Sequence, residues 1–149
     1  MVRVFLDANV YFAGSVSPTG ASALILQLAL KGRIEVTASR LVLLEAERNL
    51  RRKRSPKDLK AFHQFLKHAK LRVIPTPPET AWRRYEGVIH PKDVPVLAAA
   101  VASKAAYLIT LDRRHFLTKA VTDKVPELTI LTPGDFLRGL VRQAAPASP

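Results

Sequence analysis

Short apolar runs alternate along the chain with longer segments of helical pattern, and this alternation is compatible with few folds. We predict strands at residues 2–6, 34–37, 71–74, 107–110 and 128–131. We predict helices at residues 21–31, 39–53 and 55–69, and further helices that begin at residues 77, 93 and 132. Strands separated by helices form right-handed crossover units, which build a mostly parallel sheet with helices on its faces. The sequence therefore predicts an α/β fold.

The length of 149 residues is enough to bury the core of one domain. We predict this domain over residues 1–141 and a disordered tail over residues 142–149, because the end of the chain consists mainly of Ala, Pro and Ser. The absence of cysteine excludes disulfides and thiolate metal sites. No apolar run approaches the roughly 18 residues of a membrane span, and the first apolar run stops at Asp7, too early for a signal peptide. We expect a cytoplasmic protein that does not bind membranes.

The charge of the chain gives the first indication of a partner. Twenty-four Lys and Arg residues stand against twelve Asp and Glu, for a net charge of +12 at pH 7. Residues 48–72 hold ten of these basic residues and one acid, so this stretch carries nine of the twelve net positive charges. A polyanion such as RNA gains affinity from such a surface, because bound counterions are released when the protein binds.

The basic stretch has two interpretations. A helix face that is kept basic for solubility would usually mix charges of both signs, whereas residues 48–72 are almost entirely of one sign. We therefore favour a nucleic-acid surface over a merely solvated face. The predicted phosphate contacts are Arg51, Arg52, Arg54, Lys57 and Lys60.

Two acids follow predicted strands directly. Asp7 ends the first strand and Asp112 follows the fourth. Ligands of parallel sheets bind at the carboxyl ends of the strands, so the fold class places both acids at the functional edge. Either acid alone could simply form a turn that ends its strand; what favours a shared site is that both occupy equivalent strand ends in a chain poor in acids.

Asp93 precedes a helix made almost entirely of Ala and Val. Its position is that of an N-cap, which alone would be worth roughly 1 kcal/mol. A helix of this composition is suited to packing closely on the sheet. The acid at its N-terminal end would then point toward the edge where the strands finish.

Two glutamates interrupt the apolar helix predicted at residues 39–53. Glu45 and Glu47 flank its apolar face on opposite sides, so helical periodicity cannot choose between them. Either could instead pair with a nearby arginine at helical spacing, an interaction usually worth a few tenths of a kcal/mol.

Three motifs together resemble a known family. They are LDANV near the start, SRLVLLEAERNL, and KDVPVLAAAVASKAAYLITLDRRHF. The chain resembles the PIN domain, and is most similar to the stand-alone PIN proteins of toxin–antitoxin pairs that are related to the VapC ribonucleases. The likeness extends over residues 2–140. The last motif is the most specific, because it joins an acid at the start of an Ala-rich helix, a strand, and a second acid close to His-Phe.

The resemblance implies a three-layer fold whose five-stranded sheet has the order 3-2-1-4-5, and cleavage of RNA that depends on Mg²⁺ or Mn²⁺. It also implies an antitoxin partner and a homodimer. The family's glutamate lies six residues after the serine of the second motif, which selects Glu45 over Glu47. Matched residue by residue, the family's catalytic and metal-binding acids fall on Asp7, Glu45, Asp93 and Asp112, with Asn9 and Thr110 as supporting polar residues.

Four carboxylates close together repel one another, and this repulsion has to be offset. Two unit charges about 5 Å apart repel each other by roughly 3 kcal/mol at an effective dielectric near 20, so either their pKa values rise or a cation lies among them. Oxygen ligands select hard ions, which favours Mg²⁺ or Mn²⁺ over Zn²⁺. The histidines show no spacing typical of metal ligands, and we expect His115 to pack or to contact a phosphate.

Three other functions fit less well. Phosphotransferases of the haloacid-dehalogenase type usually carry a second Asp two residues after the first, where this chain has Asn9. A receiver domain would need a Lys after its fifth strand. A catalytically weak or inactive PIN-like module that only binds nucleic acid is the main alternative, but such a module normally lacks one of the acids, and all four are present here.

Overall fold

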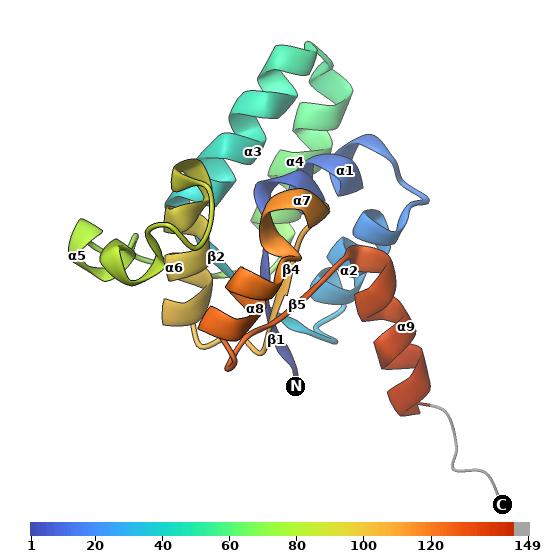
Figure 1. Ribbon diagram of the computed structural model, residues 1–149. Coiled ribbons are helices and arrows are strands. Elements are labelled where there is room, and N and C mark those ends of the chain that lie inside the picture. Colours follow the sequence, from blue (N-terminus) through green and yellow to red (C-terminus); the bar gives the residue numbers. More distant parts are fainter. Residues whose placement is uncertain (145–149) are drawn as a thin grey trace, which may run out of the picture.

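The computed structural model describes residues 1–144, which form a five-stranded sheet with helices on both sides (Figure 1). The strands are β1 (Arg3–Leu6), β2 (Glu35–Ser39), β3 (Arg72–Ile74), β4 (Tyr107–Ile109) and β5 (Thr129–Leu131). Their order is β3-β2-β1-β4-β5, and every neighbouring pair is parallel. The predicted fold class and strand order are therefore confirmed.

The helices that connect the strands start and end at recognisable signals. The longer helices are α1 (Ala8–Val16), α2 (Ala21–Leu30), α3 (Arg40–Lys53), α4 (Pro56–His68), α6 (Val94–Ala102) and α9 (Pro133–Ala144). The Ser39 hydroxyl accepts from the backbone N–H of Val42 and caps α3, and Ser55 caps α4 ahead of Pro56. The left-handed conformation of Arg54, with φ of 57°, ends α3 and lets α4 fold back beside it.

Helices cover the two faces of the sheet as separate groups. Helix α1 packs against α2, α3 and α4, and α9 packs against α2. On the other side α6 packs against β2, and α5 (Glu79–Trp82) packs against α6 (Figure 1). The Ala-rich composition of α6 permits this close approach, and Ala98, Ala99 and Ala100 are buried. The core between the layers includes Val4 and Phe5 of β1, both fully buried.

Helix α1 and several short elements were not predicted from the sequence. Helix α1 follows β1 directly, and the short helices α7 (Arg113–Phe116) and α8 (Lys119–Lys124) lie between β4 and β5. The short 3₁₀ helices η1 (Arg83–Tyr85) and η2 (Pro91–Asp93) precede α6. At the C-terminus, residues 142–144 were predicted as the start of the disordered tail, but they continue helix α9. Residues 145–149 of that predicted tail lie outside the described residues.

Within residues 1–144 no helix alone is long and apolar enough to cross a membrane. Helices α1 and α2 together have the length and apolar composition of a membrane span, but the two helices form an angle of 97° where they join.

Candidate active site

The carboxyl ends of β1 and β4 place two of the predicted acids at one edge of the sheet. Leu6 and Ile109 are register partners at the ends of these neighbouring strands. The backbone N–H of Asp7 donates to the Ile109 carbonyl at 3.0 Å, which continues the ladder by one residue. Asp112 follows three residues after β4, so both acids lie at the edge where parallel sheets bind ligands.

Asp7 is buried, with 7% of its surface exposed, and its carboxylate is held by several donors. One oxygen accepts from the backbone N–H of Ala8 at 2.8 Å, and Oδ2 accepts from the Thr110 hydroxyl at 2.7 Å. The Asn9 amide lies 3.3 Å from both Asp7 Oδ2 and Thr110 Oγ1, and its carbonyl oxygen accepts from the backbone N–H of Leu111 at 3.1 Å. Asn9 and Thr110 thus join the ends of β1 and β4 around the Asp7 carboxylate.

The electrostatic surroundings of Asp7 link it to two further predicted acids. Burial raises the pKa of Asp7 to about 6, and the charges of Glu45 and Asp93 raise it as well. The hydrogen bonds from Thr110 and Ala8 act in the opposite direction but do not offset the burial. Glu45 and Asp93 therefore lie close enough to act on the same carboxylate.

Asp93 occupies the N-cap position of α6 but does not cap it. Its backbone has φ of −96° and ψ of −7°, and its side chain accepts no hydrogen bond from the helix. The predicted N-cap position of Asp93 is therefore confirmed, but its side chain makes no capping hydrogen bond, so capping does not account for this residue. The Oδ2 atom is buried and has no hydrogen-bond partner among residues 1–144. Burial raises the pKa of Asp93, and the neighbouring charge of Asp112 raises it further.

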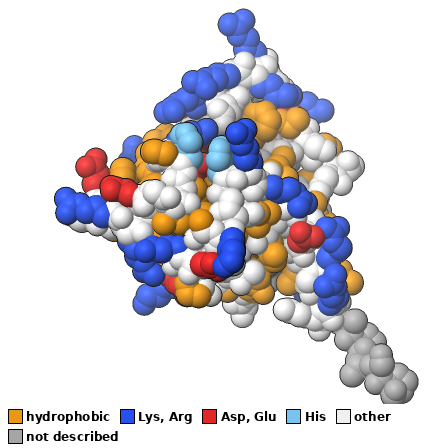
Figure 2. All heavy atoms as spheres, viewed as in Figure 1, with side chains coloured by type: hydrophobic (Ala, Val, Ile, Leu, Met, Phe, Trp, Pro, Cys, Tyr) orange, Lys and Arg blue, Asp and Glu red, His pale blue; other side chains and the backbone are white. Residues whose placement is uncertain are grey.

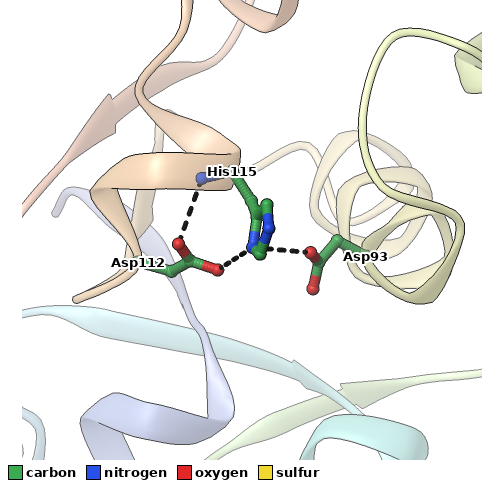
Figure 3. Close-up of side chains that lie close together, drawn as sticks. All are labelled: Asp93, Asp112 and His115. Atoms are coloured by element: carbon green, nitrogen blue, oxygen red, sulfur yellow. Dashed lines mark hydrogen bonds and ion pairs between the residues drawn. The ribbon is translucent and has the colours of Figure 1, made fainter.

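His115 completes a group of three side chains with Asp93 and Asp112 (Figure 3). One Asp112 oxygen accepts from the backbone N–H of His115 at 3.1 Å and caps α7, while Oδ2 lies 2.8 Å from His115 Nδ1. The same nitrogen lies 3.5 Å from Asp93 Oδ2. Burial acts to raise the pKa of Asp112, but the hydrogen bonds from the His115 backbone and ring outweigh it, so the pKa is lowered.

His115 was missed as a site residue in the sequence. The structure brings one ligand atom each from Asp93, Asp112 and His115 within 4.8 Å of one another. The signal was the spacing Asp112-x-x-His115, which places both side chains on one turn once α7 forms. A helix of four residues shows no hydrophobic period, so this signal could not be recognised.

Glu45 and Glu47 have different surroundings on α3. Glu47 accepts from Arg51 at 2.7 Å, and its carboxylate lies 3.6 Å from His63 Nε2. Glu45 forms no ion pair or side-chain hydrogen bond within the described part of the chain. The glutamate selected by resemblance is thus the one that acts on Asp7, and the other is used in surface pairing.

A sequence model of the PIN domain matches residues 3–114. The chain belongs to the PIN domain family. The matched segment includes the four predicted acids together with Asn9 and Thr110, and it ends one residue before His115.

Solved structures of PIN-like fold are similar to this PIN domain in architecture. VapBC2 from Rickettsia felis, bound to a DNA fragment from its promoter, has a TM-score of 0.61 at 16% identity, covering 88% of this chain and 98% of that chain. PAE2754 from Pyrobaculum aerophilum has a TM-score of 0.62 at 16% identity, with coverages of 95% and 96%. FitAcB from Neisseria gonorrhoeae has a TM-score of 0.60 at 16% identity, with coverages of 88% and 98%. At these identities the likeness concerns the fold. No curated protein matches the chain significantly.

The basic stretch of this PIN domain forms a projecting hairpin of α3 and α4 (Figure 1). Lys and Arg side chains cluster over its outer end (Figure 2). Arg51 pairs with Glu47, whereas the other four predicted contacts form no ion pair within residues 1–144. All five predicted contacts are exposed; they are Arg51, Arg52, Arg54, Lys57 and Lys60.

The raised pKa of Asp7 leads to a prediction about stability without metal. The folded state binds the Asp7 proton more tightly than the unfolded state, because the pKa is about 6 when folded against a model value of 3.8. The buried charge therefore destabilises the fold by about 3 kcal/mol above pH 6, and this cost disappears as the pH falls toward 4.

Asp7→Asn removes this charge and keeps the shape of the side chain. In urea unfolding with EDTA present, we expect the variant to gain stability relative to the wild type at pH 7.5 but not at pH 4. Hydrogen-bond differences between Asp and Asn should add only an offset that does not depend on pH. A stability difference that is equal at the two pH values would contradict the buried ionised state.

Proposed function

We propose that this PIN domain is a metal-dependent ribonuclease that cleaves single-stranded RNA. The metal would be Mg²⁺ or Mn²⁺, and the residues that hold it and catalyse the reaction would be Asp7, Glu45, Asp93 and Asp112, supported by Asn9 and Thr110. The observation that carries the proposal is the acidic edge of the sheet, where Asp7 is buried and where Asp93 and Asp112 offer ligand atoms within 4.8 Å of each other. An edge crowded with acids in a protein of charge +12 fits a cation site that acts on a polyanion.

The donor set fits a hard divalent cation. Asp93 Oδ2 is buried without a hydrogen bond from residues 1–144. In that position the carboxyl group either takes up a proton and becomes neutral or stays ionised beside a cation. Carboxylate oxygens are the ligands that Mg²⁺ and Mn²⁺ prefer. The bound ion would supply a Lewis acid that neutralises charge on the scissile phosphate and lowers the pKa of a water molecule.

The residues of the chain would have distinct tasks in this reaction. Asp93 and Asp112 present oxygens toward one another from the two sides of the site, and Thr110 fixes the orientation of the Asp7 carboxylate. During hydrolysis, the oxygen of water would form a bond to phosphorus and give up a proton to solvent, while the bond from phosphorus to the 3′ oxygen breaks and that oxygen takes up a proton. The products would carry a 5′-phosphate and a 3′-hydroxyl. This mechanism uses no histidine as general base.

The partners belong to the same proposal. We infer that the chain is the toxin of a type II toxin–antitoxin pair, that it binds an antitoxin protein and forms a homodimer, and that it acts in the cytoplasm. The support is the PIN family membership together with the similar fold of VapBC2. The alternative, an inactive PIN-like module that binds nucleic acid, predicts RNA binding without cleavage.

Metal removal tests the nuclease directly. We expect purified protein to degrade single-stranded RNA with Mg²⁺ or Mn²⁺ and to stop when EDTA is added, because the phosphate charge is then no longer neutralised. Adding excess Mg²⁺ back should restore cleavage. Cleavage at the same rate with and without EDTA would exclude the metal mechanism. Binding of RNA with no cleavage under any metal condition would favour the inactive module.

The α3–α4 hairpin should hold the RNA strand by its phosphates. Such contacts position the strand without recognising bases, so Arg52→Ala/Lys57→Ala should weaken binding to all RNA sequences alike. The log–log salt dependence of the affinity should become shallower by about 0.7 per contact removed, or about 1.4 for the pair. Titration of labelled RNA at several salt concentrations measures both quantities.

A matched control removes two positive charges near the amino ends of the strands, away from the candidate site. Lys31 and Arg33 are exposed in the loop before β2, at the amino end of the strand. Lys31→Ala/Arg33→Ala should leave the salt slope nearly unchanged. If both double variants behave alike, the basic hairpin is only a solvated face, and RNA would have to run over Arg83, Arg84, Arg113 and Arg114.

A further inference from the structure

His115 lies between Asp93 and Asp112 but outside the segment that matches the PIN domain model. It comes from α7, Asp112 caps the same helix, and Asp93 approaches from the start of α6 on the other side (Figure 3). The imidazole Nδ1 atom faces one carboxylate oxygen from each acid. Family membership therefore does not assign a role to His115 Nδ1, and the role has to be inferred from the atoms around this nitrogen.

The separations around Nδ1 resemble the edges of a coordination polyhedron. Nδ1 lies 2.8 Å from Asp112 Oδ2 and 3.5 Å from Asp93 Oδ2. Neighbouring ligands of an octahedral ion with bonds of about 2.1 Å lie about 3 Å apart. The two observed distances are on either side of this value, and one ligand atom from each of the three residues lies within 4.8 Å of the others, so movement of the carboxylates would place all three on one ion.

Asp93 supplies an observation that is independent of the distances. The residue is only 8% exposed, and its Oδ2 atom has no hydrogen-bond partner within residues 1–144. The 3.5 Å approach of His115 is too long to satisfy this oxygen. A buried ionised oxygen without a partner is costly, and a cation bound between Asp93 and His115 would satisfy it.

The His115 ring is oriented by its neighbours. Its backbone N–H donates to Asp112 and fixes the start of α7. The His90 ring packs against it with centroids 5.4 Å apart and an angle of 46° between the planes. The Nδ1 atom is therefore held toward the two acids. The Nε2 atom forms no hydrogen bond with any described residue, so it is free to keep the proton of a neutral ring.

We propose that His115 binds the metal through Nδ1, which makes the site a mixed nitrogen and oxygen site that prefers Mn²⁺ to Mg²⁺. The inference rests on the metal site of the proposed function and specifies its ligands. A neutral ring with its proton on Nε2 presents the Nδ1 lone pair to the ion, and a ring that starts with the proton on Nδ1 gives this proton to solvent while Nε2 takes one up, with no net change. Imidazole suits transition metals, whereas Mg²⁺ strongly prefers oxygen, so a nitrogen ligand shifts the preference toward Mn²⁺.

The competing arrangement keeps His115 off the metal. In that case Nδ1–H donates to Asp112 and only orients the carboxylate, as many residues around metal ligands do. The two arrangements differ in whether a nitrogen is bonded to the ion. They also differ in metal preference, because a histidine that only orients Asp112 should support Mn²⁺ and Mg²⁺ alike.

Pulsed electron paramagnetic resonance of the Mn²⁺-loaded wild-type protein distinguishes them without any substitution. A directly bonded ¹⁴N nucleus should modulate the Mn²⁺ signal, and ¹⁵N labelling of histidine should change that modulation. We expect the modulation to disappear in His115→Gln and to persist in His90→Gln, which changes the adjacent ring. Modulation that is absent from the wild type, or present in His115→Gln, would overturn the inference.

Calorimetric titration supplies a second readout that does not depend on activity. His115→Gln should weaken Mn²⁺ binding about tenfold or more and Mg²⁺ binding by much less, so the ratio of the two affinities should fall. Equal losses for both ions would assign His115 to orienting Asp112. Mn²⁺ bound through oxygen alone would overturn this inference and leave the proposed nuclease intact, whereas failure of the wild type to bind either ion would overturn the proposed nuclease itself.

Discussion

Asp93→Asn and Asp112→Asn should each abolish RNA cleavage while the protein stays folded. Each substitution removes one negative charge from the proposed cation site and keeps the size of the side chain. A metal ion is worth several kcal/mol of transition-state stabilisation, and a loss of about 4 kcal/mol corresponds to roughly a thousandfold lower rate. Asp7→Asn should lower the rate in the same way. Single-turnover cleavage of a labelled RNA measures the effect.

The melting temperature of each variant is the internal control for this prediction. The pKa values of Asp7 and Asp93 are raised, so both charges destabilise the metal-free protein, and removing either should not lower its melting temperature. Asp123→Asn is a matched substitution, because Asp123 lies on the exposed surface of α8, where it pairs with Lys119. It should leave the cleavage rate unchanged. Asp112→Asn should lower the melting temperature modestly, because, despite partial burial, the His115 hydrogen bonds lower the pKa of Asp112 and its charge therefore stabilises the fold. A collapsed melting temperature in the inactive Asp93→Asn variant would make Asp93 structural instead.

The sheet could be predicted from the sequence because its strands are short, apolar and bounded by turn signals. The order of the strands came from the resemblance, since apolar runs alone do not say which strands are neighbours. The chain order β1 to β5 and the spatial order β3-β2-β1-β4-β5 differ through crossovers that depend on tertiary packing.

Helix α1 was not predicted, and the reason is physical. Its sequence contains β-branched and aromatic residues and a glycine, which are weak helix formers. Its helical state depends on packing against α2, α3 and α4. A Cβ atom at Gly14 would lie 2.5 Å from Leu26 Cδ1, so the glycine permits the close approach of α1 and α2. Packing of this kind stabilises a helix that local propensity does not favour.

Some site residues could likewise be predicted from the sequence, whereas others depend on tertiary packing. Strand ends alone predicted that Asp7 and Asp112 share an edge, because parallel strands finish together. The position of Asp93 before α6 resembled a cap, and only the three-dimensional structure shows that its oxygen is unpartnered. Helix α7 places His115 beside Asp112, and this helix is too short to predict from a periodic pattern.

Glu45 and Glu47 provide the sharpest test of how α3 is oriented, because they lie two residues apart on one helix. Glu45→Gln should lower the cleavage rate by about a hundredfold or more, since several kcal/mol of metal binding depend on the full set of acids. Glu47→Gln should leave the rate unchanged. It removes the surface pair with Arg51, which is worth a few tenths of a kcal/mol.

The same pair of variants also predicts a change that is independent of catalysis. The charge of Glu45 contributes to the raised pKa of Asp7, whereas Glu47 pairs with Arg51 and does not act on that group. In the metal-free protein, Glu45→Gln should therefore move the pH at which Asp7 affects stability to lower values, and Glu47→Gln should not move it. If Glu47→Gln instead lowers both the rate and this pH, α3 presents its other side to the site, and Glu47 would be the fourth acid.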